Sequence, residues 1–295
     1  MIIDIRCRLS TKKMGKYFYE RVKAAGKLDQ IPALKEGTIE AFFRDLKEAG
    51  VTTAVSASGN NPGKNVGNRV RPARTTSNDE MAAIQKKHYG RIIGVAGIDA
   101  GGIFHNPLEE LERCVKKLGL KVACIEPSRS PDCPLNDKNL YPLYHKCSDM
   151  GVPVIIQTNC MGAEKLDYMH PDRVDEVAAD FPKLNIICGH GCYPWVREMI
   201  IVAGRRNNVF PSPDSHAING LGTDLWVEAV NRNLYGMANK FIFGTAYPLY
   251  PLKHMVDAYF QLPWKKEVLP QIMYKNALRA LKLENDLVFK KMYKV

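Results

Sequence analysis

The sequence predicts an α/β protein folded as a single (β/α)8 barrel, and three observations support this. Apolar, strand-like segments alternate with amphipathic, helix-like segments from one end of the chain to the other. Eight such strand candidates occur, which is the number of βα units in a barrel. Most are continuous runs of Val, Ile and Ala, as expected for parallel strands covered on both faces. The length of 295 residues suits one barrel with insertions.

The strand candidates are spaced regularly along the chain. They are residues 1–6, 52–57, 92–98, 121–126, 152–157, 184–190, 207–212 and 240–244.

Helix signals fall between the strands. A helix from Thr38 to Ala49 carries its apolar residues on one face. Ser77 and Asn78 are candidate caps for the next helix, and Asn106-Pro107 opens another, because Ser and Asn favour the N-cap and Pro the first turn. Further helices are expected over residues 137–151, 171–180, 194–203, 220–235, 251–260 and 265–283.

Two long insertions, residues 9–35 and 59–77, follow the first and second strands. Both are βα loops, so we expect them to cover the catalytic end of the barrel. A doubly wound nucleotide-binding sheet is the alternative, but it needs a glycine-rich fingerprint that residues 59–63 do not supply.

Composition restricts the class of protein. A hydrophobic content of 45% with 25% charged residues is typical of globular proteins, and no apolar run is long enough to span a membrane. The chain starts directly with a strand rather than a signal peptide, and its eight cysteines are scattered, so we expect a cytoplasmic protein without disulfides. The net charge of +11 suits a small anionic substrate. No nucleic-acid-binding motif occurs, so no nucleic-acid partner is expected.

Four segments define a candidate site. Arg6-Cys7-Arg8 follows the first strand, Gln157 ends the fifth, His190 ends the sixth, and Ala246 follows the eighth. In order and spacing these segments resemble the amidohydrolase-related family, the metal-dependent barrels that include carboxymuconate-semialdehyde and resorcylate-type decarboxylases. That family has His-x-His, His, His and Asp at these places, so only His190 matches its pattern.

The resemblance extends from Met1 to about Leu281. It implies one barrel domain over residues 1–283, followed by a C-terminal tail over 284–295. It also implies an enzyme that cleaves a C–N, C–O or C–C bond, and a homo-oligomer, since members are often dimers or tetramers.

Arg6 and Arg8 lie two residues apart and therefore point to the same face of the strand. Two buried cations need carboxylates, supplied either by the protein, from Asp4 or Glu126, or by a substrate. Guanidinium groups bind carboxylates through paired hydrogen bonds, so we expect both arginines to bind an anionic substrate. A structural ion pair at the rim of the barrel is the alternative.

Three titratable residues are candidates for catalysis. His190 is a candidate general acid/base, with a satisfied core histidine as the alternative. Glu126 ends the fourth strand and is a base or a partner for an arginine. Asp214 follows the seventh strand and is a second acid/base or a helix cap. Cys188 and Cys192 flank His190 and offer an alternative soft-metal cluster.

Two further residues are expected to hydrogen-bond the substrate. Gln157 occupies a metal-ligand position of the family, yet its amide is better suited to a carbonyl or carboxylate. Tyr247 is expected to donate to the reacting group, with aromatic packing as the alternative. Basic residues on the two insertions are candidates for steering anions into the mouth: Lys12, Lys13, Arg69, Arg71 and Arg74.

The sequence therefore predicts an amidohydrolase-like hydrolase or decarboxylase-like lyase that acts on a small carboxylate or lactone without a cofactor, zinc being less favoured. Two alternatives remain. One is a non-catalytic protein that binds an anionic metabolite. The other is a metal-dependent hydrolase or decarboxylase with rearranged ligands, drawn from His190, Glu126, Asp214 or the cysteines.

Overall fold

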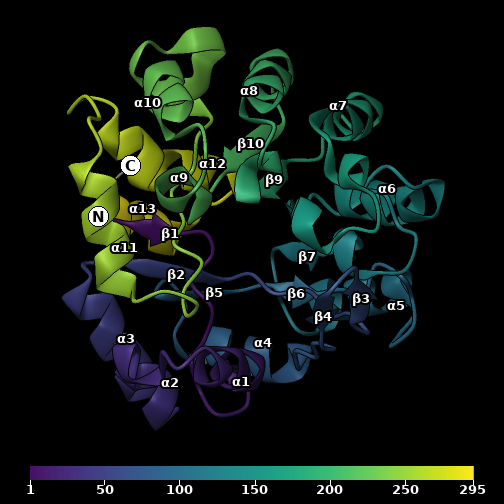
Figure 1. Ribbon diagram of the computed structural model, residues 1–295, viewed down its shortest axis with the longest axis horizontal. Helices are drawn as coiled ribbons and strands as arrows, with labels where there is room; N and C mark the ends of the chain where they lie inside the picture. Colours follow the sequence, from purple (N-terminus) through teal and green to yellow (C-terminus); the bar gives the residue numbers. More distant parts are fainter. Residues whose placement is uncertain (295) are drawn as a thin grey trace.

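Parallel strands form a closed barrel in the computed structural model, which describes residues 1–294 (Figure 1). One sheet has the order β1-β2-β5 and the other β10-β9-β8-β7-β6, and every neighbouring pair is parallel. The strands are β1 (Ile3–Asp4), β2 (Thr53–Ser56), β5 (Ile92–Gly94), β6 (Ala96–Gly97), β7 (Ala123–Ile125), β8 (Val154–Gln157), β9 (Ile186–Gly189) and β10 (Val209–Ser212). Strands β5 and β6 are two parts of one barrel position, so they join the two sheets.

The eighth barrel position, predicted as a strand over residues 240–244, forms no regular strand: Lys240 lies in a turn, and residues 241–244 belong to no regular element. It still closes the barrel, because Ile242 N donates to Pro211 O at 2.9 Å and Ile5 N donates to Phe243 O at 3.3 Å. The ladder is incomplete for two reasons. Pro211 has no N–H to donate, and Phe243 N donates to Ile272 O, on a helix, instead of to a strand.

The helices lie outside the barrel, near where the sequence predicts them (Figure 1). Thr38 caps α3 by accepting from Ala41 N at 3.1 Å, and Ser77 caps α4 by accepting from Glu80 N at 3.2 Å. The outer helices are α3 (Ile39–Glu48), α4 (Asn78–Lys87), α5 (Pro107–Glu112), α6 (Tyr141–Asp149), α7 (Pro171–Asp180), α8 (Val196–Arg205), α10 (Thr223–Asn231), α11 (Leu252–Gln261) and α12 (Asn276–Ala280).

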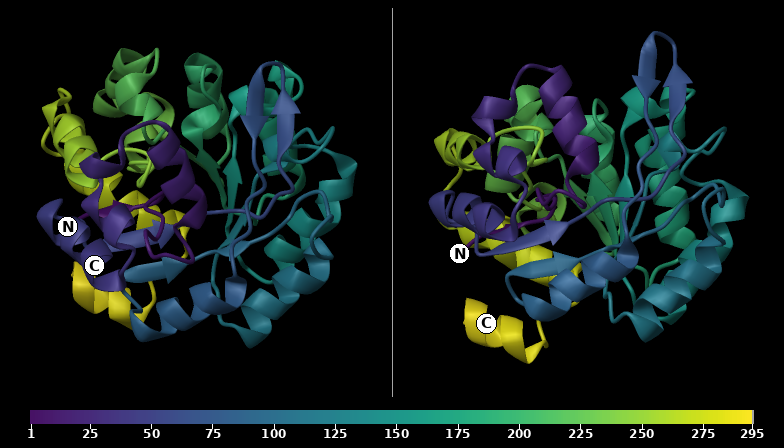
Figure 2. Two further views of the ribbon diagram at one scale, coloured as in Figure 1. Left: turned by 60° about the horizontal axis from the view of Figure 1, so that its bottom comes forward. Right: turned by 90° about the horizontal axis from the view of Figure 1, so that it is seen from below.

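Both insertions lie at one end of the barrel, as Figure 2 shows. The first contains α1 (Lys16–Ala24) and α2 (Pro32–Glu36). The second contains the antiparallel hairpin of β3 (Lys64–Val66) and β4 (Arg69–Arg71), with Gly67 at a positive φ of 55° in the turn.

The opposite end of the barrel is covered by α13 (Leu287–Tyr293), within the segment predicted as a tail (Figure 2). Phe289 and Tyr293 are buried there, and the Tyr293 hydroxyl lies 2.6 Å from Thr53 Oγ1 on β2. The segment therefore packs against the barrel. Among residues 1–294, no helix combines the length and hydropathy needed to cross a membrane.

The core has two parts. Side chains from every barrel position fill the interior, among them Ile3, Val55, Ile155, Ile187 and Ile242. A larger apolar layer lies between the strands and the surrounding helices. All eight cysteines are buried free thiols.

Candidate active site

A cavity opens at the end of the barrel where the strands finish, beneath the two insertions. Its lining comes from segments far apart in the chain, as expected for a barrel whose βα loops converge at one end. Most of the lining side chains are polar: Arg6, Arg8, Phe18, Arg21, Arg71, Arg74, Glu126, Ser128, Arg129, Gln157, Asn159, His190 and Leu249. The space between them is about 50 Å³, which is enough for a few water molecules or for one carboxylate group of a ligand.

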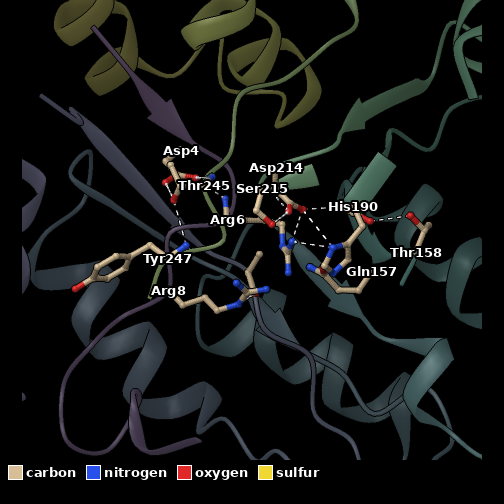
Figure 3. A network of polar contacts seen from close by, with 12 residues as sticks. Asp4, Arg6, Arg8, Gln157, Thr158, His190, Asp214, Ser215, Thr245 and Tyr247 are labelled. Atoms are coloured by element: carbon tan, nitrogen blue, oxygen red, sulfur yellow. Dashed lines mark hydrogen bonds and ion pairs between the residues drawn. The ribbon is translucent and has the colours of Figure 1, made fainter. Parts of the chain in front are cut away.

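Arg6 is paired with Asp214 rather than with Asp4 or Glu126 (Figure 3). Its Nη1 donates to Asp214 Oδ2 and lies 3.3 Å from His190 Nδ1. Asp4 instead bonds the backbone, accepting from Arg6 N at 2.9 Å and Thr245 N at 3.1 Å. Asp4 thus joins β1 to the eighth barrel position. Because Asp4 does not bind the Arg6 guanidinium, that group extends into the site and pairs with Asp214.

Asp214 is fully occupied as a hydrogen-bond acceptor. Besides Arg6, it accepts from His190 N at 2.9 Å, Ser215 N at 2.6 Å and Ser215 Oγ at 3.0 Å. Burial raises the pKa of this carboxyl, but Arg6 and the nearby histidines outweigh burial and hold the pKa well below its usual value. Asp214 is therefore an anion at neutral pH that anchors Arg6 and the His190 backbone, which is a different role from the predicted second acid/base.

His190 and Asp214 both adopt left-handed backbone conformations, with φ values of 71° and 49°. Such conformations are costly for residues other than glycine and are concentrated at functional sites. The hydrogen bond from His190 N to Asp214 Oδ2 holds the two turns against each other.

The His190 ring is neutral. Burial, reinforced by Arg6, holds its pKa well below the usual value. An arginine only donates hydrogen bonds, so the nearby Nδ1 is the acceptor nitrogen and Nε2 carries the proton. His190 therefore presents an N–H donor in the cavity, suited to an oxygen that is or becomes negatively charged.

Arg8 is a buried cation without a carboxylate partner. Its Nε donates to Ala57 O at 3.0 Å and its guanidinium lies 5.1 Å from the centre of the Phe18 ring, but its buried Nη1 has no partner among residues 1–294. Burial lowers the pKa of Arg8 well below its usual value, and Arg6 and Arg74 lower it further. An anion at this position would relieve an unfavourable arrangement.

Glu126 is paired with arginines that the sequence did not assign to it. Its Oε1 accepts from Arg74, and its Oε2 lies 3.4 Å from Arg129 Nε and 3.1 Å from Asn61 Nδ2. Burial raises the pKa of Glu126, but Arg74 and Arg129 outweigh it and leave the pKa below its usual value. An ionised, paired carboxylate of this kind is a weak base, so the alternative of an arginine partner describes Glu126 better.

Positive charge dominates the cavity. Six arginines line it against the single carboxylate of Glu126, with Asp214 lying behind Arg6. Of the basic residues proposed to steer anions, Arg71 and Arg74 line the cavity, whereas Lys12, Lys13 and Arg69 do not.

Sequence reasoning missed Arg129, Arg21 and the aromatic pair Tyr17-Phe18. Arg129 follows directly on the fourth strand, a position from which it could have been predicted. Arg21, Tyr17 and Phe18 come from the first insertion, whose conformation no local pattern specified.

Gln157 and Tyr247 have different surroundings. Gln157 lines the cavity, and its Oε1 has no hydrogen-bond partner among residues 1–294. The absence of a side chain at Gly189 makes room for this oxygen, since a Cβ at residue 189 would lie 2.7 Å from it. Tyr247 points away from Arg8 and His190, and its hydroxyl donates to Asp45 Oδ2 at 2.9 Å (Figure 3). The predicted contact between Tyr247 and the substrate does not fit this position, and the packing alternative does.

The chain belongs to the amidohydrolase family. The profile of the family described as "Amidohydrolase" matches residues 24–283, which is most of the chain. The family resemblance predicted from the sequence is thereby confirmed, as are the barrel fold and the expectation of an amidohydrolase-related protein.

Solved structures with the same fold cover nearly the whole chain. An uncharacterised TIM-barrel protein from Bordetella bronchiseptica is 29% identical, with a TM-score of 0.80 over 96% of this chain and 98% of that one. The 4-oxalomesaconate hydratase of Rhodopseudomonas palustris is 18% identical, with a TM-score of 0.67 over 100% and 99%. The dihydroxybenzoic acid decarboxylase of Polaromonas sp. JS666, with bound manganese and the inhibitor 2-nitroresorcinol, is 17% identical, with a TM-score of 0.66 over 97% and 98%. No curated protein matches.

The prediction of no cofactor is contradicted by the manganese in the similar decarboxylase. The residues of the present cavity nevertheless do not fit a divalent cation. Arg6 and Arg8 are cations, Gln157 is an amide, and Ala246 has no ligand atom. Within residues 1–294, no group of three His, Cys, Asp or Glu side chains is placed to hold a metal, so the predicted alternative of rearranged ligands also finds no such group.

Proposed function

We propose that the protein is a hydrolase or carbon–carbon lyase whose substrate is a small carboxylate, bound at the arginine-lined cavity. The observation that carries this proposal is the buried, unpartnered guanidinium edge of Arg8. A buried charge is stable only when it is paired, and a substrate carboxylate would supply the missing partner.

The similar enzymes support a carboxylate substrate. One is named as a hydratase of 4-oxalomesaconate and another as a decarboxylase of dihydroxybenzoic acid, both of which are carboxylic acids. These names do not decide whether this chain catalyses hydrolysis or a carbon–carbon lyase reaction, because fold similarity does not determine the reaction.

Three groups would act on the bound substrate. Arg8 and the unpaired Nε edge of Arg6 would hold the carboxylate. His190 Nε2–H would donate to an oxygen that gains negative charge as the bond breaks. The unpartnered Oε1 of Gln157 would accept from a substrate hydroxyl or from an attacking water.

A second candidate function is a protein that binds a carboxylate without converting it. This alternative is favoured by the state of the two acidic side chains, since Glu126 and Asp214 are both tied to arginines and neither is free to take up a proton.

Turnover assays with a panel of aromatic acids, oxo acids and carboxylated lactones test the proposal. CO2 release detects lysis, and acid release detects hydrolysis. We expect His190→Ala to lower kcat by about a hundredfold or more, because it removes the N–H group that donates to the oxygen gaining negative charge. The matched control is His145→Ala, which changes an exposed histidine paired with Asp149 on α6 and should leave kcat unchanged. Tight carboxylate binding without turnover of any panel member would favour the non-catalytic alternative.

A further inference from the structure

Helix α1 carries a tyrosine into the arginine cluster above the cavity. Tyr17 and Phe18 are adjacent on this helix, with ring centres 5.2 Å apart in an edge-to-face arrangement. Phe18 faces the cavity, where the guanidiniums of Arg8 and Arg74 both lie 5.1 Å from its ring centre. Tyr17 lies on the outer side of the same cluster.

Three arginines from three segments surround Tyr17. The guanidinium of Arg74, from the second insertion, lies 4.4 Å from its ring centre, followed by Arg129, after β7, at 5.4 Å and Arg21, on α1, at 5.8 Å. The hydroxyl oxygen accepts from Arg129 Nη1 at 3.2 Å and from Arg21 Nη1 at 3.3 Å. Both contacts use the oxygen as acceptor, so the hydroxyl proton is not needed to maintain them.

We propose that Tyr17 is a positioning residue that sets the affinity of the cavity for anions through Arg74 and Arg129. The inference rests on the proposed carboxylate-binding function. The neutral hydroxyl holds the arginines in place and leaves their charge for the substrate. The phenolate would neutralise part of that charge and so weaken the binding of a carboxylate.

The electrostatic surroundings place this change within an accessible pH range. Burial raises the pKa of Tyr17, but Arg74, Arg129 and Arg21 outweigh it and lower the pKa to about 8. The carboxylate of Glu126 also contributes to the local charge, because it is paired with both Arg74 and Arg129. Arg71, on β4, also interacts electrostatically with Tyr17. The other charged residues around the space that Tyr17 lines are Lys13, Lys16 and Glu20. Tyr17 is thus neutral below about pH 8 and increasingly anionic above it.

The test measures the affinity for tricarballylate by calorimetry between about pH 7 and about pH 9.5, a range in which this tricarboxylate is fully ionised. We expect the wild-type affinity to fall by about tenfold across the range as Tyr17 ionises. Tyr17→Phe should show no such fall. The control is Tyr19→Phe, which removes a hydroxyl from the same helix beside a different pocket. Its affinity for tricarballylate should fall with pH as that of the wild type does.

Tyrosinate absorbance supplies a second measurement that a purely structural role would not alter. We expect a titration near pH 8 that is absent from Tyr17→Phe, is present in Tyr19→Phe, and moves to higher pH when tricarballylate is bound. The same fall of affinity with pH in Tyr17→Phe as in wild type would overturn the inference. If Arg8→Met also left the affinity unchanged, the proposed function would fail with it; if Arg8→Met weakened binding, only the role of Tyr17 would be rejected.

Discussion

Replacing Arg8 with Met should stabilise the protein and weaken its binding of carboxylates. Met keeps an unbranched apolar side chain like the stem of Arg8 but removes the guanidinium that lies over the Phe18 ring. A buried, unpaired charge destabilises the ligand-free protein but strengthens the binding of an anion. Removing such a charge is therefore expected to raise stability and lower affinity.

The size of the stability change follows from two opposing contributions. Losing the charged hydrogen bond from Arg8 Nε to Ala57 O costs about 1.5–3 kcal/mol. Removing a buried charge that has no carboxylate partner gains several kcal/mol, because the desolvation of an ion in a protein costs at least that much. We therefore expect the free energy of unfolding at neutral pH to rise by about 1–3 kcal/mol.

The expected loss of affinity follows from the contact that a carboxylate would make. A hydrogen bond to a charged group contributes about 1.5–3 kcal/mol, so tricarballylate should bind about ten- to a hundredfold more weakly. Stability is measured by urea unfolding and affinity by calorimetry. The control is Arg232→Met, which removes an exposed arginine paired with Glu228 on α10; its stability should change by less than about 0.5 kcal/mol.

One result would refute this reasoning. If Arg8→Met destabilised the protein by more than about 1 kcal/mol and left the affinity for tricarballylate unchanged, Arg8 would be a structural residue. The excess of positive charge in the cavity would then need another explanation.

Three further predictions concern the carboxylates paired with the arginines and the role of Tyr247. Asp214→Asn should lower the free energy of unfolding by about 3–5 kcal/mol in urea titrations, because it leaves Arg6 buried without a partner; a loss below about 1 kcal/mol would show that the pair is not needed. The pKa values of Asp214 and Glu126 are lowered in the fold, so the stability from these carboxylates is present above about pH 4 and is lost as the pH falls through the lowered values; unfolding midpoints that did not fall with acidification would contradict this. Tyr247→Phe should lower the free energy of unfolding by about 1 kcal/mol, because it loses the hydrogen bond to Asp45, and should leave the affinity for tricarballylate unchanged. Weaker binding of tricarballylate would show that Tyr247 contacts the ligand.

The barrel could be predicted from the sequence because its apolar runs and helix caps are local signals. Thr38 and Ser77 cap helices as predicted, and strands lie at seven of the eight expected positions. The eighth segment was expected to be a regular strand. Its incomplete ladder depends on Pro211 and on a bond to Ile272, which only the assembled barrel brings together.

The site was predictable in its position but not in its pairings. Strand ends identified Arg6, Arg8, Glu126, Gln157 and His190 as neighbours, because parallel strands present their carboxyl ends at one face. Which arginine meets which carboxylate depends on side-chain directions and on the conformation of the insertions.

The long-range pairs show this limit most clearly. Asp214 meets Arg6 across 208 residues of chain, and Arg74 reaches Glu126 from the second insertion across 52. Tyr17 reaches Arg129 across 112 residues, and no spacing within the sequence indicates that contact.

A crystal structure of the protein grown with tricarballylate tests the central claim most directly. We predict a carboxylate group within hydrogen-bonding distance of the Arg8 guanidinium and of His190 Nε2, with the Arg6–Asp214 pair intact. A cavity in which Arg8 remains unpartnered, with the ligand bound elsewhere on the protein, would contradict the proposal that this is a carboxylate-binding active site.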